Sequence, residues 1–297
     1  MAAEDPSLGD RVRELASLDD RDVDVDAVSV VRYTLVTAVL LVWMLPIAAM
    51  FYIALKPTEQ LITGSFWALP NSLALLDNLA TAWQDASFRA YAVNSLLYAT
   101  VGGGLAVFLA SLAGFTIARL DPPGKNLLLY LVLLFTFFPF QMYLIPLVKM
   151  WHATGLFSSK PGMVVVYVAI AIPFAAFVLR NYFVTLPRSL YESARIDGLS
   201  DFQIYWRIYL PLAKPALAVA LIFQWVWIWN EFLFGLVLTS GAEARPIATG
   251  LASLSGRAPR WSVLAAGTLL TIVPAAIVYV SMQKYFVRGL LAGTKKG

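Results

Sequence analysis

The chain has 297 residues, of which 60% are hydrophobic and 13% charged, and its formal net charge is +4. So low a charged fraction excludes an ordinary soluble domain, which needs more charge on its surface. There is no cysteine and a single histidine, His152, which excludes a disulfide framework and a cysteine–histidine metal site.

Residues 1–29 form a polar tail before the first apolar run. Nine acidic residues and three arginines lie within residues 1–26, which therefore have a net charge of −6. Such a composition favours a disordered, solvated arm, with a regulatory or docking role as the alternative. The tail lacks the basic start, apolar core and cleavage site of a signal peptide, so we expect the first span to remain as an uncleaved anchor.

Six apolar segments are long enough to cross a bilayer, which takes about 20 helical residues. Backbone polar groups in lipid must bond within their own segment, so each segment should be an α-helix. The sequence predicts an all-α polytopic membrane protein with six transmembrane helices in one domain, residues 30–297. The predicted spans are residues 33–55, 93–118, 127–148, 162–179, 216–238 and 262–283.

Basic residues are unevenly distributed between these spans. If both termini are cytoplasmic, 15 of the 22 lysines and arginines lie on the cytoplasmic side, in agreement with the positive-inside rule. We therefore expect cytoplasmic termini and a cytoplasmic segment between the fourth and fifth spans. This excess of lysine and arginine on the cytoplasmic side of the membrane explains the positive net charge, so nucleic-acid binding is not needed to account for it.

Small residues recur at steps of four along the second span. They lie on one helix face and predict close packing against a neighbouring helix, with pore lining as the alternative. Prolines are expected to interrupt several spans. The small residues are Gly102, Ala106, Ala110 and Gly114, and the prolines are Pro139, Pro146, Pro173 and Pro274.

Residues 187–215 form a polar island between the fourth and fifth spans and have the pattern of two short helices. The first helix starts after Pro187 and ends at Gly198, which accepts the left-handed conformation of a helix end. Ser200 and Gln203 have capping-box spacing and start the second helix, which we expect to stop at residues 210–215.

Phe202 and Trp206 lie four residues apart on the second predicted helix and form an apolar ridge. Exposed apolar side chains that cluster in this way are usually buried against another surface. The surface that buries them is either that of a partner protein or the ends of the chain's own helices.

The island resembles the EAA loop of ABC-importer permeases, which is the site where the cytoplasmic ATPase binds the membrane subunit. The departures, Ser193, Leu199 and Trp206, are mild. The resemblance implies that the two helices, with Phe202 and Trp206, dock on an ATPase. The matching positions are Glu192, Ala194, Asp197, Gly198, Ile208, Leu210, Pro211 and Pro215.

Further segments resemble the sugar-importing branch of that family, especially the maltose-type second permease: residues 54–57, 94–96, 229–232 and 285–290. The resemblance implies the maltose-type permease fold in the bacterial or archaeal cytoplasmic membrane. The implied partners are a homologous second permease, two copies of an ATPase and an extracytoplasmic substrate-binding protein.

The chain itself has no phosphate-binding loop, because its nearest match, Gly124 followed by Lys125 and Asn126, lacks the first glycine and the hydroxyl. No catalytic constellation is present either. We expect no enzymatic activity and no cofactor in this chain, with ATP and Mg²⁺ bound by the partner ATPase.

Polar side chains inside or near the spans are candidates for a translocation path: Asn94, Gln141, Gln224, Asn230 and Glu231. Glu231 is the only ionisable group among them and lies near Trp225, Trp227, Trp229 and Phe232. Intramembrane carboxylates usually face a cavity or partner, and aromatic faces suit sugars. The alternative is an interfacial aromatic belt, with Glu231 paired to a base.

Two more segments are candidate contacts. Residues 245–260 resemble the maltose-type loop that enters the binding protein, with Arg245, Gly250, Ser255 and Arg257 as candidates; a simple connector is the alternative. The basic C-terminal tail, residues 285–297, resembles the maltose-type tail that inserts between the ATPase subunits, or it anchors to lipid.

The sequence as a whole predicts the permease subunit of a binding-protein-dependent ABC importer for a carbohydrate. An importer for another solute, such as a glycerol phosphate or an osmolyte, is the alternative within the class. An ion-coupled secondary transporter would show intramembrane carboxylates and an inverted repeat, whereas this sequence has one such carboxylate and no apparent repeat.

Overall fold

The structure is a computed structural model that describes residues 27–84, 86–137, 139–254 and 260–294. The chain divides into two units, Met1–Ala49 and Met50–Gly297. In the first unit the described part is helix α2 (Ala27–Ala54), which continues into the second unit and runs through Pro46. It is long and apolar enough to cross a membrane. The acidic tail of residues 1–26 lies outside the described residues.

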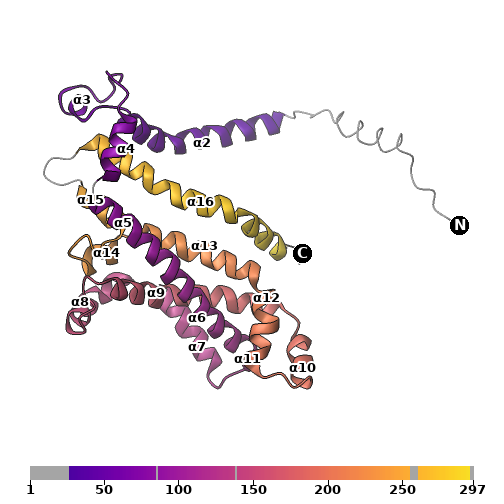
Figure 1. The fold of residues 1–297 in the computed structure, drawn as a ribbon. Helices are drawn as coiled ribbons and strands as arrows, with labels where there is room; N and C mark the ends of the chain where they lie inside the picture. The colour runs from indigo at the N-terminus through magenta and orange to yellow at the C-terminus, as the bar shows by residue number, and fades with distance from the viewer. Residues whose placement is uncertain (1–26, 85, 138, 255–259, 295–297) are drawn as a thin grey trace. The chain divides into compact units, whose positions relative to one another are not determined.

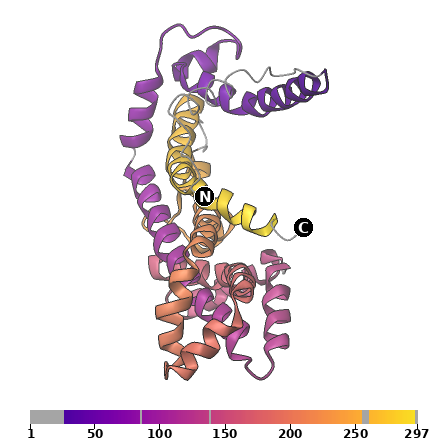
Figure 2. The same cartoon turned by 90° about the vertical axis from the view of Figure 1, so that its right-hand side faces the viewer.

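The described part of the second unit is helical, without strands (Figures 1 and 2). Its elements are α3 (Thr58–Thr63), α4 (Leu75–Gln84), α5 (Ala86–Leu97), η1 (Tyr98–Gly102), α6 (Gly103–Phe115), η2 (Thr116–Leu120), α7 (Lys125–Phe137), η3 (Phe140–Tyr143), α8 (Leu144–Ala153), α9 (Lys160–Thr185), α10 (Arg188–Ile196), α11 (Asp201–Ile204), η4 (Tyr205–Tyr209), α12 (Leu210–Leu212), α13 (Lys214–Asn230), α14 (Leu233–Leu238), α15 (Ile247–Leu254) and α16 (Trp261–Thr294).

This architecture confirms the all-α membrane class but not a count of six spanning helices. Among the described residues, four helices are long and apolar enough to cross a membrane: Val28–Ala54, Ser87–Leu120, Lys160–Thr185 and Trp261–Ser281. A fifth candidate consists of Asp201–Leu212 and Lys214–Asn230, which meet at a bend of 77°.

The third predicted span, residues 127–148, is not one helix. α7 ends at Phe137, Pro139 is extended (φ −64°, ψ 122°), and η3 and α8 follow. Proline lacks the amide N–H that the helix needs and pushes the preceding residue out of helical conformation. By contrast α9 and α16 run through Pro173 and Pro274, so the expected interruptions there were wrong.

The fifth predicted span, residues 216–238, is also broken. α13 ends at Asn230, Glu231 is extended (φ −67°, ψ 129°), and α14 starts at Leu233. The Glu231 carboxylate accepts hydrogen bonds from the backbone amides of Phe234 and Gly235. A side chain that satisfies the first amides of a new helix favours a restart over a continuous helix.

The small residues of the second span lie in the most extensive helix–helix contact among the described residues of the unit. α6 packs against α9, and both contact α13, which packs in turn against α16. A Cβ on Gly114 would lie 2.9 Å from the Arg180 backbone nitrogen, and Ala106 and Ala110 are fully buried. The structure therefore confirms helix packing as the role of this stripe.

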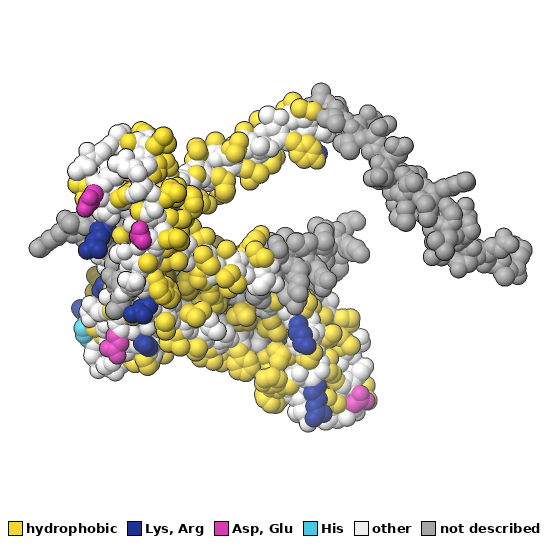
Figure 3. All heavy atoms as spheres, turned by 45° about the horizontal axis from the view of Figure 1, so that its top comes forward, with side chains coloured by type: hydrophobic (Ala, Val, Ile, Leu, Met, Phe, Trp, Pro, Cys, Tyr) yellow, Lys and Arg dark blue, Asp and Glu magenta, His cyan; other side chains and the backbone are white. Residues whose placement is uncertain are grey.

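Charged and hydrophobic side chains are segregated on the visible surface of the second unit. Figure 3 shows lysine, arginine, aspartate and glutamate gathered towards the ends of its helices, with hydrophobic side chains between them. An apolar band between charged ends is the pattern of a protein that spans a bilayer.

Candidate functional site

The first helix of the polar island is α10, which begins directly after Pro187 as expected. It ends with Gly198 in the left-handed conformation (φ 81°). The Leu199 amide donates to the Ala194 carbonyl at 3.0 Å and the Gly198 amide donates to the Arg195 carbonyl at 3.1 Å. These two bonds form a Schellman motif, which turns the chain sharply towards the second helix.

The second helix of the island starts with the predicted capping box. The Ser200 side chain accepts from the Gln203 amide, and the Gln203 side chain accepts from the Ser200 amide. The helix then continues through η4 and α12 to Leu212. The sharp bend comes at Ala213, within the expected range of residues 210–215, and Pro211 is accommodated near the start of α12.

The two helices expose an apolar surface. The side chains of Ile196, Phe202 and Trp206 are 87%, 65% and 41% exposed. Trp206 also contacts Phe108 of α6, with ring centroids 6.0 Å apart, so the chain's own helix covers only part of the ridge. In the structure the ridge predicted from Phe202 and Trp206 also includes Ile196, and from here on the apolar ridge means these three residues.

The other matched positions are divided between the core and the surface. Ala194 is buried, and Leu210 is half-buried. Glu192, Asp197 and Pro211 are exposed beside the apolar ridge. The side chains of these exposed members are not buried in the chain's own core.

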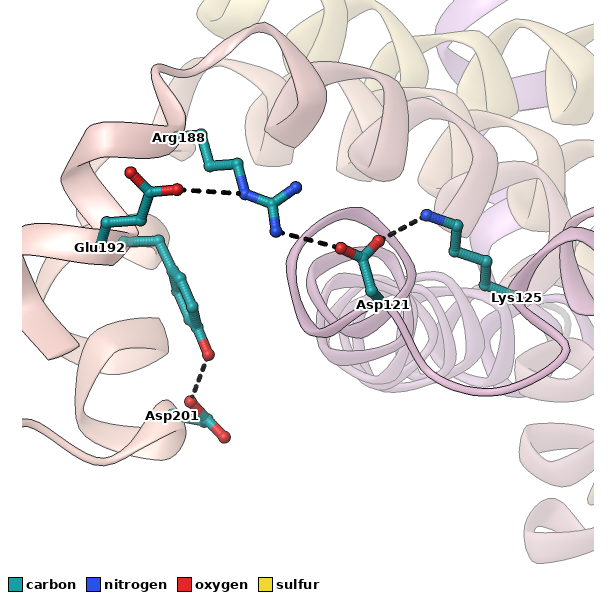
Figure 4. A network of polar contacts seen from close by, with 6 residues as sticks. Asp121, Lys125, Arg188, Glu192 and Asp201 are labelled. Carbon is teal, nitrogen blue, oxygen red and sulfur yellow. Dashed lines mark hydrogen bonds and ion pairs between the residues drawn. The ribbon is translucent and has the colours of Figure 1, made fainter.

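Glu192 belongs to a chain of ion pairs between α10 and the turn after η2 (Figure 4). Arg188 lies 3.4 Å from the Glu192 carboxylate and 3.2 Å from Asp121, which also pairs with Lys125 at 2.5 Å. Exposed pairs of this kind contribute little stability singly. They join α10 to the end of the second span.

Hydrogen bonding by Lys125, supported by Arg188, lowers the pKa of Asp121 below its ordinary value. A lowered carboxyl pKa means that these pairs exist above the usual titration range of aspartate and are lost as the pH falls through the lowered pKa. The network is therefore intact at neutral pH. Nearby, partial burial raises the pKa of Tyr191, so its hydroxyl stays protonated and donates to Asp201 at 2.7 Å.

Arg119 is a functional candidate that sequence reasoning missed. It is buried at the end of the second span, and its guanidinium donates to the carbonyls of Phe183 and Leu186 at the end of α9. It also lies over the Tyr209 ring at 5.3 Å. One side chain thus holds together the second span, α9 and the second helix of the island.

We expect Gly198→Val to weaken the turn between the two helices. A left-handed conformation costs a residue other than glycine about 1–2 kcal/mol, and no neighbouring atom lies within 4 Å of a Cβ at this position, so backbone strain is the only penalty. Gly198→Asn is the matched control, because asparagine tolerates this conformation. Hydrogen exchange of the Leu199 amide measures the turn; equal exchange in both variants would contradict the expectation.

A groove lies between α9, α13, η3 and α16. Two adjoining hollows, of about 320 and 640 Å³, share Phe140, Phe223 and Trp227 in their walls. The first is also lined by Gln224, and the second by Asn230 and Glu231. Three of the five predicted path residues therefore line this groove.

Glu231 is buried in the wall of this groove. It accepts hydrogen bonds from the Tyr167 hydroxyl at 2.9 Å and the Phe234 amide at 2.8 Å. The described contacts of the carboxylate are therefore hydroxyl and amide donors and not the base that the packing alternative required. Satisfied in this way, a carboxylate is tolerated within a membrane protein.

The tryptophans around Glu231 have different roles. Trp225 and Trp229 stack on each other, with ring centroids 5.1 Å apart, and bond to Thr100 and to the Thr271 carbonyl. They serve packing. Trp227 is half-buried and contributes its ring to the groove.

The other two path candidates lie elsewhere. Asn94 is buried and donates to the carbonyls of Ala242 and Arg245, both at 3.0 Å, so it holds the segment before α15 in place. Gln141 is exposed on η3 and is not among the residues that line the groove.

The candidate contacts with a binding protein are only partly described. Arg245 is half-buried, and Gly250 is buried so tightly that a Cβ would lie 2.0 Å from the Tyr91 ring. Gly250 therefore has a packing role. Ser255 and Arg257 lie outside the described residues, as do residues 295–297 of the tail, whose helical backbone in α16 is described to Thr294.

Comparison with known proteins identifies related chains. The family model for "Binding-protein-dependent transport system inner membrane component" matches residues 102–291. The alpha-glucoside transport system permease protein AglG of Rhizobium meliloti is 39% identical over 229 residues, which are 75% of this chain and 60% of that protein. The osmoprotective compounds uptake permease protein GgtD of Synechocystis is 31% identical over 262 residues, 86% and 88% of the two chains. The chain thus spans less than two thirds of AglG but most of GgtD.

A solved structure has a similar fold. A chain of a bacterial ABC transporter involved in the import of the acidic polysaccharide alginate superposes with a TM-score of 0.74 and 23% sequence identity. The match covers 96% of this chain and all of the other. At this identity the likeness establishes the fold and nothing more.

Proposed function

Because this chain belongs to the family of binding-protein-dependent transport system inner membrane components, we propose that it is the translocation subunit of an ABC importer for a carbohydrate. The single observation that supports this most is the extent of the family match, since residues 102–291 include both the groove and the apolar ridge. A chain with both features can bind a solute within the membrane and receive force from the cytoplasm.

The apolar ridge and the exposed Glu192 form the proposed docking surface for the ATPase. Ile196, Phe202 and Trp206 present bulky side chains that a cleft in a partner would cover. The Schellman turn and capping box make the helix pair stiff, and Arg119 joins it to the ends of two long helices. Closure of an ATPase dimer would thereby move the membrane helices. ATP and Mg²⁺ would be bound by that partner.

The proposed complex contains two permease chains, two copies of the ATPase and an extracytoplasmic binding protein. Both termini of this chain would be cytoplasmic, in keeping with its distribution of basic residues. The segment around Arg245, together with Ser255 and Arg257, remains the proposed contact with the binding protein.

The groove is the proposed path of the carbohydrate. Sugars present hydroxyls at their edges and C–H groups on their faces, so a site for them needs polar groups beside an aromatic ring. Gln224 and Asn230 supply amides, Glu231 supplies a carboxylate, and Trp227 supplies the ring. AglG, by its name, carries alpha-glucosides, which makes a glucoside the first substrate to test.

We expect Trp227→Ala to reduce apparent substrate affinity roughly 2- to 12-fold, since an aromatic contact contributes about 0.5–1.5 kcal/mol. The measurement is ATP-dependent uptake of a labelled glucoside into vesicles that contain the whole complex. Trp261→Ala, which removes an exposed tryptophan outside the groove, is the control. An unchanged affinity in Trp227→Ala would exclude this groove as the path.

The same vesicles distinguish the alternative functions. GgtD is named for osmoprotective compounds, and uptake of a small osmolyte in preference to glucosides would replace the proposed substrate class. Uptake that persists without ATP and stops when the ion gradient is dissipated would indicate a secondary transporter and refute the proposal.

A further inference from the structure

The segment between α2 and α4 has an exposed apolar surface that neither the groove nor the apolar ridge uses. No charged residue lies between Glu59 and Asp77. Trp67 and Leu69 are 78% and 80% exposed. With the exposed side chains of Ile62, Phe66, Leu73 and Leu76, they form what we name the apolar lobe.

Four successive backbone carbonyls of the apolar lobe lie within hydrogen-bond distance of side chains from the segment that precedes it. Lys56 donates to the carbonyl of residue 66 at 2.5 Å, and Gln60 donates to that of residue 69 at 2.6 Å. The Tyr52 hydroxyl lies 3.2 and 2.7 Å from the two carbonyls between them. Four successive carbonyls are thus bonded within the protein. A loop in this state can leave water, because unsatisfied carbonyls would otherwise be costly in a low-dielectric medium.

The one lysine at the base of the apolar lobe, Lys56, is shielded from solvent by aromatic rings. Lys56 is fully buried, with its ammonium 4.3 Å from the centre of the Tyr52 ring and 5.8 Å from that of Phe66. Aromatic faces stabilise a cation in such a position. Because residues 57–76 contain no other lysine or arginine, the outer surface of the lobe is free of positive charge.

The base of the apolar lobe lies beside the first turns of a spanning helix. The helix that follows it, α4, packs Leu75 and Leu79 against Ala265 and Ala266. Those alanines are one to two turns inside α16, whose membrane-spanning part begins at Trp261. Asn78 of α4 also donates to the carbonyls of residues 54 and 56, both at 2.9 Å, which fixes it to the end of α2. The base of the lobe is therefore level with the outer end of a membrane span.

We propose that the apolar lobe inserts into the interface of the outer lipid leaflet, with Trp67 and Leu69 at the boundary between headgroups and acyl chains. Tryptophan is enriched at that boundary because its ring is apolar and its N–H is polar. The partner is the bilayer itself. Insertion of the lobe would fix the external end of the subunit in the lipid interface. The lobe is adjacent to α4, which contacts both the C-terminal end of α2 and the start of α16.

The absence of cysteine makes the test direct. Leu69→Cys and, separately, Leu73→Cys are labelled with a nitroxide in the full complex, in nanodiscs of phosphatidylcholine and phosphatidylglycerol. Collision rates with oxygen and with a water-soluble nickel chelate then give the depth of each label. We expect both labels to lie in the boundary region between headgroups and acyl chains, roughly 5–10 Å into the interface. Glu59→Cys, at an exposed charged position of the same segment, should remain in water.

A Leu69→Cys label that meets the nickel chelate as freely as the Glu59→Cys label would overturn the proposal. The proposal would also be overturned if the labels were accessible to water in the complex without the binding protein and became shielded only after the binding protein was added. That result would identify a protein docking site. Leu73→Cys gives the same readout if Leu69→Cys fails to fold. The measurement requires no transport, so its outcome is independent of whether the substrate is a carbohydrate.

Discussion

Gly114→Leu is expected to separate α6 from α9 and to prevent accumulation of the folded chain. A Cβ at this position would lie 2.9 Å from the Arg180 backbone nitrogen and 3.3 Å from the Ala176 carbonyl oxygen. Both are backbone atoms of a packed helix, so neither can rotate aside. Overpacking usually costs about 1–3 kcal/mol where side chains can adjust, and we expect a cost at or above the top of that range here.

The matched control is Gly104→Leu, ten residues earlier on α6. A Cβ on Gly104 has no neighbouring atom within 4 Å. Both variants replace a helical glycine by leucine, so the gain in helix propensity is the same for both. Thermal unfolding in detergent, followed by size-exclusion chromatography, should show a lower transition for Gly114→Leu only. Equal transitions would mean that α6 and α9 do not approach as closely as the structure shows.

Arg119→Met is expected to lower the stability of the cytoplasmic end and to uncouple ATP hydrolysis from uptake. The change leaves the carbonyls of Phe183 and Leu186 without their guanidinium partner, at about 1–3 kcal/mol for each buried group left unsatisfied. α10 begins two residues after Leu186. A loosened end of α9 therefore allows the apolar ridge to change its orientation relative to the spans.

Two further variants separate the causes of that effect. Arg119→Lys keeps the charge but loses the planar fork that reaches two carbonyls, so we expect an intermediate result. Arg89→Met removes an exposed arginine of α5 and should behave like the wild type. The measurements are thermal unfolding of the chain and the ratio of ATP hydrolysed to substrate imported by the complex. An unchanged ratio in Arg119→Met would show that Arg119 does not position the helix pair.

Local features were predictable because each depends on a few neighbouring residues. The length of an apolar run specifies a helix in lipid, and the second, fourth and sixth spans are described as single long helices. The left-handed turn at Gly198 and the capping box at Ser200 depend on backbone rules that act within four residues. Spacing by four likewise placed Gly102 and Gly114 on one packed helix face.

Features that depend on distant contacts were decided only by the tertiary structure. Glu231 breaks the fifth span and bonds to Tyr167, and Arg119 bonds to Phe183; each pair is separated by 64 residues. No local pattern indicates such pairs. Proline shows the same limit, because α7 ends at Phe137, two residues before Pro139, whereas α9 continues through Pro173. The uninterrupted spans and the helix caps thus follow from the sequence by itself, whereas the breaks in the third and fifth spans, the groove, the buried arginine and the scaffold of the apolar lobe depend on how distant segments pack together.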